Sequence, residues 1–319
     1  MPNLPTTFYR DNTIINTARE LLDHLMPMNL RCQIRHILYQ TKSYLDTRKL
    51  GMFSNVGIET TTRCNQHCSY CPFAVKDNRK TKQRMATEMS PDLFSKIIDQ
   101  LAALGFKGKI ALQGFGEPLL DPLLEQRIRE ARTKLPEAYI TINTNGRLLT
   151  PEKLQALIKA GLSHVYITNH LDGKANAELD QRIKTMQNEP SLRPYISYFS
   201  RLTKLRNRGG TCDKALFRDY AQHGLTATPV DRQICISEIN TLNISASGNV
   251  LVCSDSFVEG KSNVMGNLSR NSIADIWFSD RFRALRRDIR KGIFNCIACR
   301  RCNVGENKES TQSSLEKAA

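Results

Sequence analysis

The chain has 319 residues, a formal net charge of +15 and a hydrophobic fraction of 40%, which is typical of globular proteins. No apolar run is long enough to cross a membrane as a helix, and the first residues lack the basic-then-apolar order of a secretory signal. We therefore expect a cytoplasmic protein of one large or two smaller domains that does not interact with membranes.

The positive charge is concentrated at residues 201–208 and 281–291. Basic proteins often bind nucleic acid or other acidic partners. Aromatic residues make up only 7% of the chain, however, and no interleaved set of them predicts a platform for stacking bases. The second basic set falls on a predicted helix whose apolar positions are Phe282, Leu285 and Ile289. This pattern favours a solvated basic face over a nucleic-acid site.

Residues 1–50 predict an N-terminal helical extension. Apolar side chains recur at helical spacing near residues 12–26 and again over roughly 30–45. A helical cap packed on the following domain is favoured over a module that binds a partner.

From residue 51 to 210, short apolar runs alternate with amphipathic segments. Strands are predicted near 55–60, 109–113, 138–143, 164–168 and 195–201. Helices are predicted near 91–104, 123–135, 151–161 and 175–187, two of them opened by a capping residue and a proline at Ser90-Pro91 and Thr150-Pro151. This order predicts a parallel α/β barrel or partial barrel, with reactive groups at the carboxyl ends of its strands.

Three cysteines follow the first predicted strand directly. Cys64, Cys68 and Cys71 have the spacing C-x3-C-x2-C, and Tyr70 precedes the third thiol. Structural zinc sites and ordinary iron–sulfur clusters each require four ligands. Three ligands in one short loop therefore imply either a distant fourth ligand or a cluster with one open iron. Zinc binding or unligated thiols remain the plainer alternative.

Loops rich in glycine and asparagine follow the next two predicted strands. Gly114 and Gly116 allow close approach of the backbone to a ligand, and the Glu117 carboxylate can accept from an ammonium group. Asn145 lies in the turn after the third strand. Taken alone, each of these loops is explained equally well by a tight turn.

A second set of cysteines lies in the last third of the chain and comprises Cys235, Cys253, Cys296, Cys299 and Cys302. The first two flank residues 236–252, in which a turn of serine, glycine and asparagine joins two β-prone runs and predicts a hairpin. The last three follow two predicted helices. Zinc and an iron–sulfur cluster both suit four of these thiols.

Taken together, these motifs resemble the radical S-adenosylmethionine superfamily. Residues 113–118 are similar to its G-G-E-P segment, with Phe115 where the family commonly has glycine, and residues 143–146 are similar to its T-N-G segment. The basic loop at 205–210 looks like the family's N-R-A-G segment, with a linker between domains as the alternative. Residues 235–302 resemble the SPASM or twitch extension, although with fewer cysteines than the full SPASM form.

The resemblance implies a partial (β/α)6 TIM-like barrel. We expect four regions: the helical extension at 1–50, the barrel at 51–210, a cysteine-rich SPASM/twitch-like domain at 211–306 and a disordered polar tail at 307–319. It also implies a 4Fe–4S cluster on Cys64, Cys68 and Cys71 whose open iron binds S-adenosylmethionine. Cofactor contacts carried over in the same way fall on Tyr70, Gly114, Gly116, Glu117, Asn145 and Arg208.

The second cysteine set is implied to hold one auxiliary cluster, with one surplus thiol among Cys296, Cys299 and Cys302. The implied chemistry is reductive cleavage of the cofactor to a 5′-deoxyadenosyl radical, which abstracts hydrogen from the substrate. A small polyol or aminosugar that is dehydrogenated or epimerised is favoured, with a flavodoxin or ferredoxin as the one-electron donor. In an epimerisation, Cys212 is the candidate hydrogen donor; a small buried side chain is its plainer role.

Two alternatives to a small-molecule enzyme stay open. One is a radical enzyme that modifies a ribosomal peptide. The other is a zinc-bearing protein that binds nucleic acid, with an affinity that falls steeply as salt rises.

Overall fold

The computed structural model describes residues 51–68, 71, 73, 87–170, 176–200, 204–205, 226–227, 240–254, 263–291, 293–296 and 299–300, together with positions 34, 37, 41 and 44. Those last four positions are helical, but the rest of the predicted N-terminal helices lies outside the described residues. The predicted tail and the domain boundary at residue 210 lie outside them too. No helix in the described part of the chain is long and apolar enough to span a membrane.

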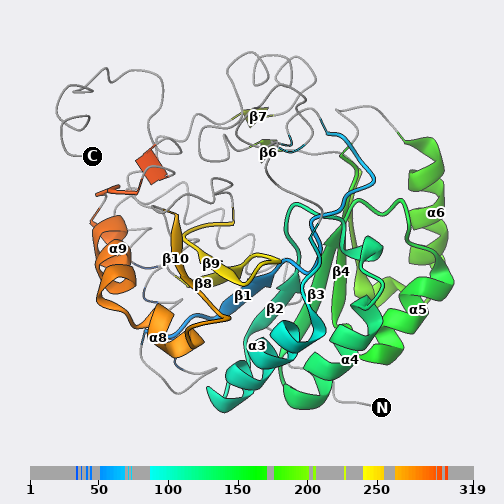
Figure 1. Ribbon diagram of the computed structural model, residues 1–319. Helices are drawn as coiled ribbons and strands as arrows, with labels where there is room; N and C mark the ends of the chain where they lie inside the picture. Colours follow the sequence, from blue (N-terminus) through cyan, green and yellow to red (C-terminus); the bar gives the residue numbers. More distant parts are fainter. Residues whose placement is uncertain are drawn as a thin grey trace.

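An eight-stranded sheet forms the centre of the molecule, with the strand order β10-β9-β8-β1-β2-β3-β4-β5 (Figure 1). Five of its strands run parallel in sequence order: β1 (Asn55–Ile58), β2 (Lys109–Leu112), β3 (Tyr139–Thr144), β4 (His164–Thr168) and β5 (Ile196–Phe199). The predicted α/β alternation is thereby confirmed. A separate parallel pair, β6 (Lys204–Leu205) and β7 (Thr226–Ala227), lies outside this sheet.

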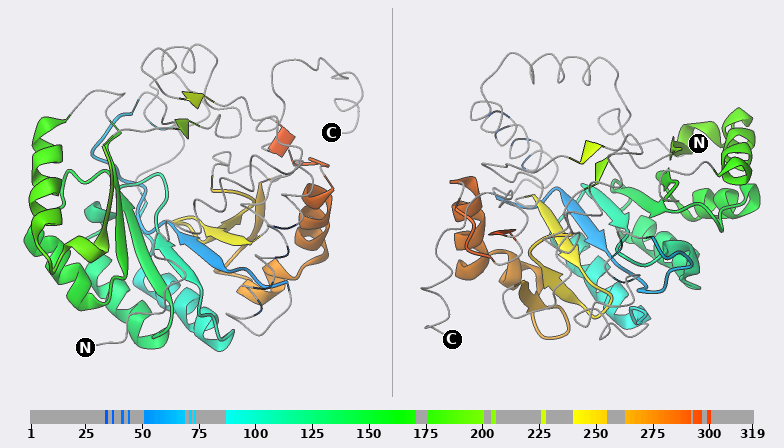
Figure 2. Two further views of the ribbon diagram at one scale, coloured as in Figure 1. Left: turned by 180° about the vertical axis from the view of Figure 1, so that it is seen from behind. Right: turned by 90° about the horizontal axis from the view of Figure 1, so that it is seen from above.

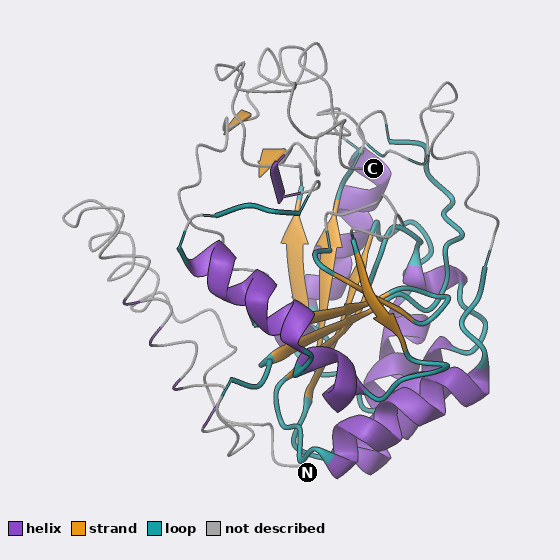
Figure 3. Ribbon diagram, turned by 60° about the vertical axis from the view of Figure 1, so that its left-hand side comes forward, coloured by secondary structure: helices purple, strands orange, loops and turns teal. Residues whose placement is uncertain are grey.

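Helices cover the outer face of the parallel strands (Figure 3). They are α3 (Pro91–Ala103), α4 (Leu124–Lys134), α5 (Pro151–Ala160) and α6 (Ala177–Asn188), with short 3-10 turns η1 (Pro118–Leu120) and η2 (Arg193–Tyr195). Both predicted N-caps are present: Ser90 Oγ accepts from Leu93 N at 3.3 Å, and Thr150 Oγ1 accepts from Lys153 N at 3.2 Å. The apolar core fills the space between these helices and the sheet. The opposite, inner face of the sheet is not covered by these helices.

The predicted hairpin in the cysteine-rich region is confirmed as β8 (Thr241–Ile244) and β9 (Asn249–Leu251). It is followed by an unpredicted strand, β10 (Val264–Asn267). β8 pairs in parallel with β1, from Asn55↔Thr241 to Ile58↔Ile244, so the hairpin extends the barrel sheet (Figure 2). The hairpin therefore continues the sheet directly beside β1.

Two helices close the described C-terminal region, α8 (Ile273–Trp277) and α9 (Asp280–Arg290). The prediction that all of the basic residues at 281–291 lie on a solvated face is wrong at Arg286, which is buried. Its guanidinium stacks 4.0 Å from the Trp277 ring centroid and donates to Trp277 O at 2.7 Å. Burial, with the nearby charges of Arg290 and Arg283, lowers the Arg286 pKa to about 10.

Candidate active site

A cavity of about 300 Å³ lies at the carboxyl ends of the parallel strands. Residues in or just after four strands line it: Gly57 and Glu59, residues 143–145, Thr168 and His170, and residues 243–245. The lining is thus rich in neutral hydrogen-bonding groups.

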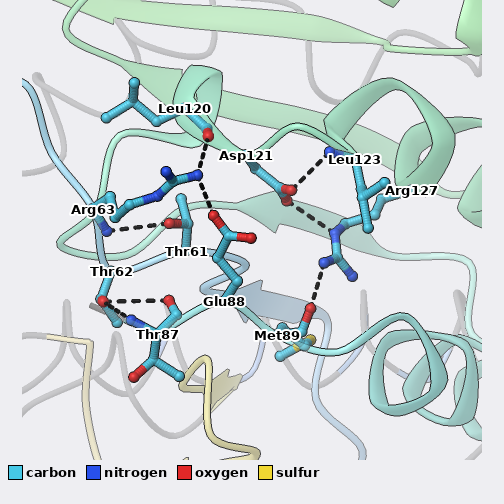
Figure 4. A network of polar contacts seen from close by, with 10 residues as sticks. All are labelled: Thr61, Thr62, Arg63, Thr87, Glu88, Met89, Leu120, Asp121, Leu123 and Arg127. Atoms are coloured by element: carbon cyan, nitrogen blue, oxygen red, sulfur yellow. Dashed lines mark hydrogen bonds and ion pairs between the residues drawn. The ribbon is translucent and has the colours of Figure 1, made fainter. Parts of the chain in front are cut away.

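The loop that carries the first three cysteines is tied to the loop after β2 (Figure 4). Glu117 N donates to Arg63 O at 2.7 Å. The Arg63 guanidinium donates to Leu120 O at 3.0 Å and pairs with Glu88. Thr62 and Thr87 exchange further hydrogen bonds, including Thr87 N to Thr62 Oγ1 at 2.7 Å. The cysteine loop therefore has a defined position relative to the glycine loop.

The two predicted cofactor glycines are required by contacts within the protein. A Cβ at Gly116 would lie 2.0 Å from Thr61 O, and one at Gly114 would lie 2.4 Å from Glu59 Cγ. Phe115, which replaces the family's usual glycine, packs on Phe73 with 5.4 Å between ring centroids. All three residues of this loop line the cavity. Their contact with the cofactor stays a prediction.

Glu117 joins the loops that follow β2 and β3. Its carboxylate is buried and accepts from Leu119 N at 3.1 Å, Thr144 Oγ1 at 2.6 Å and Asn145 N at 2.9 Å. Desolvation raises the Glu117 pKa, and these hydrogen bonds together with the Lys153 charge oppose the shift. The structure thus shows Glu117 holding Asn145, a role that the sequence did not indicate.

Asn145 completes the connection back to the cysteine loop. Its Nδ2 donates to Asn65 Oδ1 at 2.8 Å, and its Oδ1 accepts from Arg147 N at 2.9 Å. Asn65 lies directly after Cys64 in sequence. Hydrogen bonds consequently join the cysteine loop to the predicted residues Glu117 and Asn145 at the carboxyl ends of the parallel strands.

Sequence reasoning missed Glu59, which follows β1 and is 4% exposed. Its Oε1 accepts from Phe115 N at 2.9 Å, and its Oε2 accepts from Ala246 N at 3.4 Å. The carboxylate therefore bridges the glycine loop and the turn of the C-terminal hairpin. The available signal was a lone acidic residue ending an apolar strand, just ahead of the cysteine motif.

Two amides beside Gly57 were also missed. Asn243 is opposite Gly57 in the strand register, and a Cβ at Gly57 would lie 3.1 Å from Asn243 Oδ1 and 3.9 Å from Gln113 Nε2. All three residues line the cavity. The glycine thus leaves a hollow between two carboxamides, and only the pairing of β8 with β1 reveals it.

Cys64, Cys68 and Cys71 line the same cavity, and none of the three forms a disulfide. No three Cys, His, Asp or Glu side chains in the described ranges converge closely enough to hold a single metal ion. A polynuclear cluster makes a different demand, because each thiolate binds a separate iron. Three thiols around one cavity, beside polar side chains, would fit such a cluster.

The described members of the second cysteine set also lie together. Cys253 and Cys299 pack against a small cluster formed by Val252 and Cys296. Cys296 Sγ donates to Asn263 Oδ1 at 3.0 Å. The remaining predicted site residues lie outside the described residues: Tyr70, Arg208, Cys212, Cys235 and Cys302.

Comparison with known proteins assigns the class. Residues 58–170 match the radical SAM superfamily, and residues 235–303 match an iron–sulfur cluster-binding domain, SPASM. The chain belongs to the radical SAM superfamily and carries a C-terminal SPASM iron–sulfur domain. Its cofactors are accordingly S-adenosylmethionine, a 4Fe–4S cluster and an auxiliary cluster, which argues against the zinc alternative.

Individual members of the superfamily resemble this chain over most of its length. The S-adenosyl-L-methionine-dependent 2-deoxy-scyllo-inosamine dehydrogenase of Niallia circulans is 29% identical over 254 residues, covering 79% of this chain and 93% of that protein. The crystal structure of BtrN in complex with AdoMet and 2-DOIA has a TM-score of 0.63 at 29% identity and covers 76% of this chain and 88% of that one. An open conformation of BtrN gives 0.56 at 25% identity, covering 84% and 98%.

Similarity to a peptide-modifying relative is confined to part of the chain. The PqqA peptide cyclase of Gluconobacter oxydans is 32% identical over 120 residues, which is 38% of this chain and 31% of that protein. This match therefore supports a shared radical SAM domain and does not support a shared peptide substrate.

Proposed function

We propose that this protein is a radical SAM dehydrogenase that oxidises one alcohol carbon of an aminocyclitol or aminosugar-like small molecule. The observation that carries the proposal is the similarity to the 2-deoxy-scyllo-inosamine dehydrogenase, because it spans 79% of this chain and 93% of that enzyme. The cavity agrees with it: carboxamides and hydroxyls, including Gln113, Asn243 and Thr168, suit a ligand with many hydroxyl groups.

The residues have separable tasks in this proposal. Cys64, Cys68 and Cys71 hold the first cluster, and the backbone at Gly114 and Gly116 forms the wall against S-adenosylmethionine. When bound, these cofactors supply a 5′-deoxyadenosyl radical that removes a hydrogen atom from the substrate. The chain's contribution is to orient the two ligands and to exclude water from them.

Oxidation of the alcohol is completed by loss of one proton and one electron from the substrate. We assign the auxiliary cluster to Cys235, Cys253 and two of the thiols Cys296, Cys299 and Cys302; the packing of Cys253, Cys296 and Cys299 together supports this assignment. That cluster offers the substrate electron a destination within the protein. A flavodoxin or ferredoxin in the cytoplasm is the external carrier that we propose.

The test uses anaerobically reconstituted enzyme with 2-deoxy-scyllo-inosamine, S-adenosylmethionine and dithionite. We expect a product two mass units lighter than the substrate, formed one-to-one with 5′-deoxyadenosine. Deuterium at the oxidised carbon should appear in the 5′-deoxyadenosine. A product of unchanged mass would contradict dehydrogenation, and cleavage without product across a panel of aminocyclitols and aminosugars would overturn the substrate class.

Two variants sharpen this test. Cys299→Ala should still release 5′-deoxyadenosine but lose the ketone product, because the substrate radical has no internal oxidant. Cys212→Ala should turn over normally, since a dehydrogenation needs no hydrogen donor. An epimerised product that disappears in Cys212→Ala would favour the epimerase alternative instead.

A further inference from the structure

The segment from Asp280 to Lys291 concentrates positive charge on one helix. It carries six cations against two acids, Asp280 and Asp288. Five of the six cations are exposed: Arg281, Arg283, Arg287, Arg290 and Lys291. Several of these are three or four positions apart on α9, a spacing at which like charges repel each other and weaken a helix. We call Arg283, Arg287, Arg290 and Lys291, which the helical repeat puts on one side of the segment, the basic face of α9.

Local acids offset little of this charge. Arg287 Nε lies 3.5 Å from Asp288 Oδ1, but Asn295 Nδ2 also donates to that carboxylate, at 3.0 Å to Oδ2. The Arg283 guanidinium lies 5.5 Å from the Phe278 ring centroid, a contact that orients it without neutralising it. The basic face therefore presents a net positive surface.

The opposite side of α9 contacts the second cysteine set. Leu285 packs against the cluster formed by Val252 and the buried Cys296, against which Cys253 and Cys299 also pack. The chain after α9 turns back on the helix, with Ile293 N donating to Asp288 O at 2.9 Å, and then reaches Cys296. A helix with its side chains is about 10 Å across. A partner on the basic face would thus lie about one helix thickness from these thiols.

We propose that the basic face of α9 is the docking surface for an acidic one-electron carrier protein, which exchanges electrons with the iron–sulfur site formed by the second cysteine set. This inference rests on the proposed dehydrogenase function. One electron enters for each cofactor cleavage, and one leaves when the alcohol carbon is oxidised with release of a proton. A carrier that accepts the electron released by the substrate can return an electron for the next cofactor cleavage. The cycle therefore needs no other oxidant.

Charge complementarity is the physical reason for choosing an acidic carrier. Opposite charges steer association and orient the partners, and both effects weaken as salt screens them. Such a surface gives fast, transient binding, which suits repeated electron exchange. It also explains why the cations gather beside the thiols when the helices α5 and α6, on the far side of the molecule, carry no comparable set (Figure 1).

The test compares three full-length proteins for binding of an acidic flavodoxin: wild type, the variant Arg283→Glu/Arg287→Glu/Arg290→Glu, and a control with Lys159→Glu/Lys184→Glu/Arg193→Glu. The control residues are exposed and lie on α5, α6 and η2. At low salt we expect the α9 variant to lose about 10- to 1000-fold in association rate constant. The control should stay within about twofold of wild type, in keeping with a specific surface.

Turnover then separates this proposal from the function on which it rests. With dithionite as reductant, the α9 variant should release 5′-deoxyadenosine as wild type does, whereas turnover driven by reduced flavodoxin should fall. Equal flavodoxin binding by wild type and the α9 variant would overturn the docking surface, even if dithionite turnover is normal. Loss of binding to a DNA duplex with flavodoxin binding unchanged would overturn it as well. If charge reversal disturbs folding, flavodoxin binding is measured for the variant with Gln at the same three positions. A loss of binding in that variant supports the docking surface, and unchanged binding overturns it.

Discussion

Gly116→Ala should abolish most cofactor cleavage while the fold persists. The added Cβ would lie 2.0 Å from Thr61 O and 3.0 Å from Arg63 O, and these backbone atoms cannot rotate away. The loop must move instead, which breaks the Glu117 N to Arg63 O hydrogen bond of 2.7 Å. A displacement of about 1 Å can cost about 10²-fold in rate. Overpacking should lower the free energy of unfolding by about 1–3 kcal/mol.

The measurement is 5′-deoxyadenosine release by reconstituted protein, alongside thermal unfolding. Gly105→Ala is the matched control, because Gly105 has φ +67° and nothing within 4 Å of the added Cβ. It should lose about 1–2 kcal/mol from the left-handed backbone and retain cleavage per folded molecule. Equal cleavage by Gly116→Ala and wild type would show that the glycine loop does not form the cofactor wall.

Glu59→Gln should uncouple cofactor cleavage from substrate oxidation. Glu59 Oε1 accepts from Phe115 N at 2.9 Å, and Glu59 Oε2 accepts from Ala246 N at 3.4 Å. The amide of Gln would turn an NH₂ group toward one of these donors, leaving it unsatisfied at a cost of about 1–3 kcal/mol. The glycine loop and the hairpin turn would then shift relative to each other. Product formation should fall by about 10- to 100-fold.

The informative readout is the ratio of 5′-deoxyadenosine to oxidised product, which should rise well above one. A role limited to stability would lower both together and leave the ratio unchanged. Glu125→Gln is the control, since Glu125 pairs with Arg129 on the exposed side of α4 and such pairs contribute about 1 kcal/mol or less. We expect that variant to keep the wild-type ratio.

Local sequence signals predicted the parallel half of the fold well. Ser90-Pro91 and Thr150-Pro151 start α3 and α5 because a side-chain cap and a proline satisfy the first helical turn. The alternation of strands and helices was sufficient for the order of β1 to β5. The hairpin turn around Gly248, which has φ +79°, was equally visible.

What escaped prediction depends on contacts between distant segments. The pairing of β8 with β1 joins residues nearly two hundred positions apart, and it alone brings Asn243 beside Gly57 and Ala246 beside Glu59. Arg286 looked like one more surface arginine, since its burial depends on the Trp277 ring beneath it. Glu117 was predicted as a contact to the cofactor. The structure shows that its carboxylate accepts hydrogen bonds from Thr144 and Asn145 and so supports the neighbouring loop.

We propose that Cys64, Cys68 and Cys71 hold the cluster that cleaves S-adenosylmethionine. The most direct measurement is iron and sulfide per chain, together with dithionite-dependent 5′-deoxyadenosine, for wild type and Cys68→Ala prepared anaerobically. We predict about eight irons for wild type and about four for the variant, from the stoichiometry of two four-iron clusters, with cleavage only by wild type. Undiminished iron content and cleavage in Cys68→Ala, or a wild-type protein that binds no iron, would contradict the claim.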